Sequence, residues 1–354
     1  MTNLTPPPEQ FSEAEVSDDE TKVVRKPGGR RKPLPRVRKN PGIKPADTMA
    51  EAGRKILRFQ FAHMLSHEDG TRKGEDIEEL HDMRVATRRM RAAFDVFGQF
   101  FKTKEVKKHL KRLRTTGRTL GRMRDLDVFM EKAHRHLESL PENERTGLSP
   151  LLKAWQQKQT EEREKLVAYL GSDKYQQFKQ DFNEFTSSFD VIALPISETN
   201  PNPNLINHVV PVLIYTRLNA VRAQETLIPN AAVEQLHALR IELKKLRYAM
   251  EFFREVLGKE AKDVINELKA LQDHLCDLTD TNVVCQILSE FIQEAEALQS
   301  RLPLNDRQSL EPVVKYLAAK HAERHTLMAA FPDLWESFNN RETLKKIALS
   351  ISTL

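Results

Sequence analysis

The chain has 354 residues, only 12 glycines and a formal net charge of +5. Residues that favour helices dominate, which predicts an all-α protein with room for two helical bundles or one pseudo-symmetric domain. No signal peptide opens the chain and no apolar run reaches about 18 residues, so we expect no membrane span and a cytoplasmic location. Cys276 and Cys285 lack CxxC spacing and companion ligands, which argues against structural zinc and against a disulfide scaffold.

Residues 1–45 form a proline-rich head that we expect to be disordered. The head holds eight prolines, ten Lys/Arg and six Asp/Glu, with almost no large apolar side chain, and such a composition cannot build a core. Its basic part, residues 22–44, either adds non-specific attraction to a polyanion or serves as a solubilising tail. The rest of the chain nearly balances 46 Lys/Arg with 45 Asp/Glu. Anion binding there must come from sorting cations onto particular faces.

Residues 46–190 are predicted to form a first helical half. Asp47 or Thr48 can cap a helix that ends near His67, and a short loop with Gly70 and Gly74 follows. Further helices are predicted over residues 77–101, 104–120, 148–170 and 173–188, and one more from the turn at 124–128 to about residue 140.

A proline-containing linker at 191–204 leads to a second half, residues 205–354, that repeats this order. Its helices are predicted over 205–227, around His237, and over 259–278, 281–299 and 310–328, with two shorter segments within 332–351. The turns Arg124-Asp125-Leu126-Asp127-Val128 and Thr279-Asp280-Thr281-Asn282-Val283 lie 155 positions apart. Asp125 and Asp280 are predicted to cap the helix that follows each turn or to hold a neighbouring cation.

One histidine-plus-three-cations pattern occurs twice, 156 positions apart, which indicates an internal duplication. The copies are His81, Arg84, Arg88 and Arg91, and His237, Arg240, Lys244 and Arg247. On a helix these spacings fall within an arc of roughly 80°, so each set forms one stripe. Apolar bands flank both stripes, and each band needs a covering helix. We therefore expect the stripes to line a groove or channel, where crowded cations are stable only with counterions or a polyanionic ligand.

A third stripe is predicted on the helix over 104–120. It consists of Lys107, Lys111, Arg114 and Arg118, at spacings of four, three and four residues. The second half retains Lys262 and Lys269 at the equivalent positions, but Asn266 and Asp273 replace two of the cations. The first half is therefore expected to contribute more ligand contacts.

The two histidine motifs and the paired turns resemble those of the CHAD family, the conserved histidine α-helical domain. The resemblance covers roughly residues 47–340, and it implies that residues 46–340 together form one all-α domain of two pseudo-symmetric four-helix bundles with a basic groove or pore between them. It also implies non-catalytic binding of inorganic polyphosphate and recruitment to polyphosphate granules. Lys244 departs from the pattern, because it replaces an arginine and loses the planar fork that can bind two phosphate oxygens.

The expected ligand is a long polyanion bound without a catalytic residue, metal or cofactor. The expected polyphosphate-binding residues are His81, Arg84, Arg88, Arg91, Lys107, Lys111, Arg114, Arg118, His237, Arg240, Lys244, Arg247 and Lys269. A polyanion beside the two motif histidines would favour their protonated form, so binding should strengthen below pH 7.

Other interpretations remain open at this stage. The basic head and a pI near 9.0 favour nucleic-acid binding, although few aromatics are placed for stacking. A phosphoanhydride-processing enzyme could use His81 or His237, but the chain has no P-loop and no acidic metal cluster. Metal chelation by the histidine pairs would lack a third ligand in register. More simply, the histidines could be satisfied at helix interfaces and the arginines could sit in a salt-bridge network.

Overall fold

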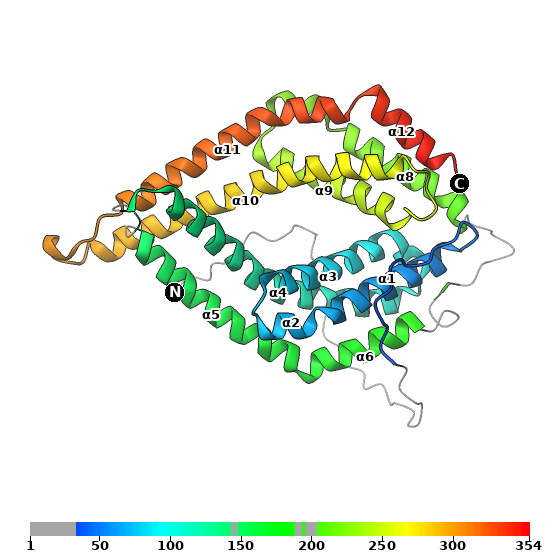
Figure 1. The fold of residues 1–354 in the computed structure, drawn as a ribbon, viewed down its shortest axis with the longest axis horizontal. Coiled ribbons are helices and arrows are strands. Elements are labelled where there is room, and N and C mark those ends of the chain that lie inside the picture. The colour runs from blue at the N-terminus through cyan, green and yellow to red at the C-terminus, as the bar shows by residue number, and fades with distance from the viewer. Residues whose placement is uncertain (1–32, 143–144, 146–147, 188–192, 195–203) are drawn as a thin grey trace. The chain divides into compact units, whose positions relative to one another are not determined.

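All regular structure in the residues that the structure describes is helical, which confirms the predicted all-α class. The structure is a computed structural model, and it describes residues 33–142, 145, 148–187, 193–194 and 204–354. The helices are α1 (Met49–Ser66), α2 (Glu68–Lys73), α3 (Ile77–Phe97), α4 (Thr103–Ser139), α5 (Ser149–Gly171), α6 (Asp173–Ser187), α8 (Ile206–Arg222), α9 (Val233–Phe252), α10 (Ala261–Gln299), α11 (Glu311–Phe338) and α12 (Arg341–Ile351) (Figure 1). None of them is long and apolar enough to cross a membrane.

The two longest helices run through the places where turns were predicted. α4 has 37 residues and α10 has 39, and each continues without a break past Asp125 or Asp280. The prediction of separate helices there was wrong. Of the two roles predicted for these aspartates, capping a helix was wrong and holding a neighbouring cation is confirmed. Each carboxylate instead lies near a cation, Asp125 3.8 Å from Arg84 and Asp280 3.6 Å from Lys132. An aspartate held in this way does not compete for the backbone N–H groups of its own helix.

Smaller differences occur at other helix boundaries. Thr48 caps α1 as predicted, because its side chain accepts a hydrogen bond from the Glu51 N–H. The predicted loop at 70–74 is mostly the short helix α2, and Gly74 ends it in the left-handed conformation at φ 73°. The histidine-motif helix α3 stops at Phe97 instead of residue 101, since a short 3₁₀ turn (Gly98–Phe100) follows it. α11 extends through Pro332 to Phe338.

The helices pack in two sets, α1–α6 and α8–α12. Within the first set α3 packs on α1 and α4, and α4 packs on α5; within the second, α9 and α11 pack on α10 (Figure 1). Between the sets, α3 packs against α9 and α1 against α8. Phe97 of α3 lies 6.1 Å from Phe252 and 5.5 Å from Phe253, measured between ring centroids. The two histidine-motif helices are therefore direct neighbours.

The apolar bands predicted beside the stripes form part of the main core. Buried members on α3 include Met83, Met90 and Phe94, and buried members on α9 include Leu239 and Leu243. A second, smaller core lies where the distal parts of α4, α5, α10 and α11 meet, and it contains Ala133, Leu148, Leu151, Trp155, Val284, Leu288, Val313 and Tyr316. Burying these bands fixes the rotation of α3 and α9, and hence the direction in which their cations point.

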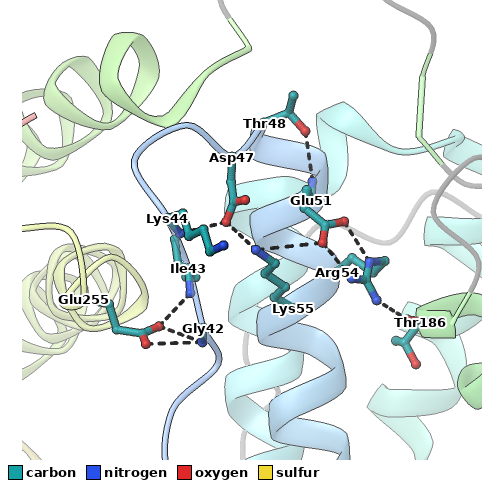
Figure 2. A network of polar contacts seen from close by, with 10 residues as sticks. All are labelled: Gly42, Ile43, Lys44, Asp47, Thr48, Glu51, Arg54, Lys55, Thr186 and Glu255. Carbon is teal, nitrogen blue, oxygen red and sulfur yellow. Dashed lines mark hydrogen bonds and ion pairs between the residues drawn. The ribbon is translucent and has the colours of Figure 1, made fainter.

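The segment before α1 is tied to the second set of helices. The backbone N–H groups of Gly42 and Ile43 donate to the Glu255 carboxylate at 2.9–3.2 Å, and Ile43 is buried. Lys55 Nζ lies 2.7 Å from the Asp47 carboxylate at the start of α1 (Figure 2). Most of the predicted head, up to residue 32, lies outside the described residues, but residues 42 and 43 at its end are packed against the domain.

Candidate functional site

The first cationic stripe lies along α3 beside α4. His81, Arg84, Arg88 and Arg91 are all partly exposed, while the residues that alternate with them at helical spacing are buried. Two glycines of α4 make room for the long side chains. A methyl group on Gly121 would lie 3.6 Å from Arg84 Nε, and one on Gly117 would lie 3.7 Å from Arg91 Nη1. The guanidinium groups of α3 therefore extend across α4.

The second stripe lies along α9 beside α10 with a similar relation to its neighbour. Arg240 Nη1 donates to Cys276 Sγ at 3.6 Å, and Cys276 is 155 positions after Gly121. His237 and Lys244 are partly exposed on the same helix. Arg84 thus lies beside position 121 of α4, and Arg240 lies beside position 276 of α10, which is 155 residues later.

Arg247 differs from the other motif cations because it is buried. Its Nε lies 3.6 Å from the Glu251 carboxylate, and its guanidinium lies 5.5 Å from the centre of the Tyr248 ring. Glu251 also binds Arg89 of α3 at 3.1 Å. Arg247 therefore stabilises the contact between α3 and α9 and is not exposed to a ligand, contrary to the prediction that it contacts one.

The third stripe is the most exposed of the three. Lys107, Lys111, Arg114 and Arg118 are all exposed on α4, and among the described residues none of them has an ion pair with a carboxylate. The neighbouring Lys108 and Arg112 differ, because both bind Asp181. On α10, Lys269 is likewise exposed. A row of four unpaired cations on one helix face repels itself, and an anion bound along it would relieve that repulsion.

Cations from both sets of helices gather around Asp95 on α3. This side chain is exposed. Partial desolvation of the carboxylate raises its pKa, and the charges of four nearby cations lower it, but desolvation is the larger effect. Arg91 and Arg114 come from the first set, and Arg217 of α8 and Lys245 of α9 come from the second. The charge of Asp95 is therefore offset by cations from both sets of helices.

Arg217 and Lys245 were not among the predicted site residues. The spacing of 156 residues between the two histidine motifs would have pointed to Lys245. Lys245 stands 156 positions after Arg89, and Glu251 stands 156 positions after Asp95. In the Arg89–Glu251 ion pair, at 3.1 Å, the cation comes from α3 and the carboxylate from α9. In the interaction of Lys245 with Asp95, the cation comes from α9 and the carboxylate from α3. No comparable pattern in the sequence marks Arg217.

The motif histidine of α3 is half-buried among charges of both signs, namely Arg124, Arg88, Glu78 and Asp82. Burial lowers the pKa of His81 below its usual value, and the charges of Arg124 and Arg88 add to the effect. The imidazole is therefore neutral near pH 7 without a ligand. A bound polyanion would raise this pKa again, so anion binding at this position is coupled to proton uptake.

The candidate site is rich in cations and, among the described residues, holds no evident metal-binding group. No group of three or more His, Cys, Asp or Glu residues in the described part of the chain could hold a metal ion. A cavity of about 450 Å³ between α4, α10 and α11 contains Lys132, Arg135 and Lys320. All three have carboxylate partners, namely Asp280, Glu131 and Glu323. The cations of this cavity are therefore already neutralised by carboxylates, unlike those of the α4 stripe.

Comparison with known proteins identifies relatives of this fold. The family model for the CHAD domain matches residues 55–289. The structure is similar to the crystal structure of the CHAD domain from the plant Ricinus communis, with a TM-score of 0.65 and 21% identity over 85% of this chain and 96% of that one. It is also similar to PptA from Streptomyces chartreusis, with a TM-score of 0.63 and 14% identity over 82% of this chain and 100% of that one. No curated protein matches the sequence.

Proposed function

Since this chain belongs to the CHAD domain family, we propose that it binds inorganic polyphosphate without chemically changing it. The ligand would lie on the cationic surface made by α3, α4 and α9. The family resemblance supplies the identity of the ligand, and the geometry of the charges supports a long, flexible polyanion. We propose recruitment to polyphosphate granules as the cellular role of this binding.

The observation that carries the proposal is the unpaired cation row on α4. Lys107, Lys111, Arg114 and Arg118 follow one another along one face of the helix, and at a rise of about 1.5 Å per residue they extend over roughly 16 Å. A chain of phosphates can neutralise all four at once, whereas a single small anion can reach only one or two. Arginine forks also bind two phosphate oxygens each, which suits a ligand rich in oxygens and poor in other features.

We further propose that the two sets of helices are copies of one duplicated unit, divided near the linker at 191–204, with the ligand between them. Three equivalences support this inference. Arg84 beside Gly121 matches Arg240 beside Cys276. Arg89 bound to Glu251 matches Lys245 near Asp95. Arg84 near Asp125 matches Arg240 near Asp280.

A calorimetric titration with long-chain polyphosphate tests the proposal. Wild-type protein is expected to bind with an affinity that falls steeply with salt, with a log–log slope of roughly −0.7 for each phosphate contact. Arg84→Ala/Arg88→Ala should weaken the binding, and Glu161→Ala/Glu164→Ala on α5 serves as a control for double substitution elsewhere. Absence of binding by the wild-type protein in moderate salt would refute the function.

The same assay separates the alternatives. Single-stranded RNA or duplex DNA that displaces polyphosphate at equal phosphate concentration would favour a nucleic-acid-binding protein. Phosphate release by the pure protein with polyphosphate and magnesium, abolished in His81→Ala, would favour an enzyme. We expect neither result, because the charges form a row without an acidic metal cluster in the described residues.

A further inference from the structure

Two carboxylates, one from each set of helices, lie close to cations of the candidate region: Asp125 is 3.8 Å from Arg84, and Asp280 is 3.6 Å from Lys132. Desolvation is the main cause of the raised pKa of Asp125 on α4, and the like charge of Asp280 on α10 raises it further. Both side chains remain open to solvent, at 43% for Asp125 and 49% for Asp280. They are thus accessible to a ligand and not buried in the core.

Each carboxylate is surrounded by charged groups from several helices. Asp125 faces Arg84 of α3, and Arg124 lies beside it on its own helix. Asp280 faces Lys132 of α4 and Arg240 of α9, with Asp277 beside it on α10. Arg84 and Arg240 are motif cations, so each carboxylate interacts with one cation of a stripe.

The ion pairs that these carboxylates make are loose. Arg84 Nη2 lies 3.8 Å from Asp125 Oδ1, and Lys132 Nζ lies 3.6 Å from Asp280 Oδ2. For comparison, Arg112 binds Asp181 at 2.7 Å and Lys179 binds Glu68 at 2.8 Å. Charges at such separations near solvent attract by only about 1 to 4 kcal/mol before other costs, so a competing anion of sufficient charge can replace the carboxylates.

We propose that Asp125 and Asp280 make the site selective for long, densely charged chains over short anions. This inference rests on the proposed function. A ligand that approaches Arg84 or Arg240 must overcome the repulsion of both carboxylates. A short anion has only the few contacts at that place to offset the repulsion, whereas a long chain also gains the contacts with Lys107, Lys111, Arg114 and Arg118. The carboxylates therefore weaken the binding of short anions more than that of long ones.

Protonation changes this selectivity in a predictable direction. Desolvation is the main cause of the raised pKa of Asp125 and of Asp280. Both groups therefore lose their charge at a less acidic pH than an ordinary aspartate would. As the pH falls and the carboxylates become neutral, the short anion should gain affinity relative to the long chain.

The test compares tripolyphosphate with long-chain polyphosphate by calorimetry at pH 7.5, using wild-type protein and Asp125→Asn/Asp280→Asn. The amide keeps the size of the side chain and removes its charge. We expect the double variant to bind tripolyphosphate about tenfold more tightly than the wild type and long-chain polyphosphate less than about threefold more tightly. Asp306→Asn/Asp333→Asn removes two exposed carboxylates elsewhere and should leave the ratio of the two affinities unchanged.

Each other outcome has a definite meaning. Failure of the wild type to bind long-chain polyphosphate would refute the proposed function itself. Wild-type binding of the long chain, together with an unchanged affinity ratio in a folded double variant, would refute only the selectivity. Weaker binding of both ligands by the double variant would also overturn the proposed selectivity. That result would mean that the carboxylates hold the arginines in place for the ligand and do not repel it. Should the double variant not fold, Asp125→Asn and Asp280→Asn measured singly must each shift the ratio in the same direction.

Discussion

α4 and α10 are the two longest helices, and each follows a histidine-motif helix in the chain, but they present different charges. α4 carries Lys107, Lys111, Arg114 and Arg118 on one face, whereas the equivalent positions of α10 are Lys262, Asn266, Lys269 and Asp273. All eight side chains are exposed. Exposed positions contribute little to stability, so the two helices can keep the same packing while their outer faces diverge. On the proposed function, this difference predicts that the first half provides most of the ligand contacts.

The buried faces of the two helices differ as well. His109 of α4 is 1% exposed and lies between the rings of Phe182 and Phe185, with centroid distances of 5.2 and 4.6 Å. The equivalent position of α10 is Val264, which is fully buried. α4 thus holds an ionisable group where α10 holds an aliphatic one, and this gives the two halves different responses to acid.

Removing the α4 stripe should have the largest effect. We expect Lys107→Gln/Lys111→Gln/Arg114→Gln/Arg118→Gln to weaken long-chain polyphosphate binding by on the order of a hundredfold or more, because several charge-assisted contacts are lost together. Calorimetry at fixed salt measures the change. Lys262→Gln/Lys269→Gln on α10 should cost less than about tenfold. Equal losses from the two helices would contradict the comparison.

The buried histidine should make the fold sensitive to acid. Burial lowers the pKa of His109 to about 3 in the folded protein, below the ordinary value near 6.5 of the unfolded chain. The unfolded chain therefore binds the proton first, and stability is lost as the pH falls from about 6.5 toward 3. At pH 5 we expect a cost of about 2 kcal/mol in the free energy of unfolding.

Replacement by the α10 residue isolates this effect. His109→Val should remove about 2 kcal/mol of the stability difference between pH 7 and pH 5, measured by urea unfolding. The cavity left by the smaller side chain lowers stability at both pH values, so the difference between them is the informative quantity. An unchanged difference would show that other groups cause the acid sensitivity.

Giving α10 the charges of α4 should strengthen binding. Asn266→Lys/Asp273→Arg copies Lys111 and Arg118 onto the second half, and we expect about a tenfold gain in affinity for long-chain polyphosphate. Gln308→Lys/Asp306→Arg adds the same charge at exposed positions between α10 and α11 and is the matched control. A similar gain from both variants would mean that net charge, and not position, governs the affinity.

The smallest expected effect concerns a glycine of α4. A methyl group on Gly117 would meet Arg91 Nη1 and Thr87 Cγ2 at 3.7 Å, which is ordinary contact, and the equivalent residue of α10 is Gln272. Gly117→Ala should therefore stabilise the protein by roughly 0.5–1 kcal/mol through helix propensity. Thermal unfolding measures the gain, and a loss of stability would show that Arg91 needs this space.

Much of the fold was predictable because its signals are local. Thr48 capping α1, the helices α5 and α6, and the buried bands beside both stripes follow from side-chain type and spacing within one helix. The predicted turns at Asp125 and Asp280 failed for a non-local reason. Aspartate is a frequent helix cap, but these two have charged partners on other helices, and sequence spacing does not show such partners.

The sequence by itself determined the helical class and the spacing of the cations along each helix, since both depend on periodicity within a single helix. Only the tertiary structure decided which cations remain exposed. Arg247 carries the same spacing as its fellow motif residues, yet it is buried where α9 packs against α3, and its partner Glu251 also binds Arg89 of α3. Tertiary packing also brought Asp125 near Asp280 and gathered Arg217 and Lys245 around Asp95. The electrostatic energy of a charged group depends on its distance from groups remote in the chain, and folding alone sets those distances.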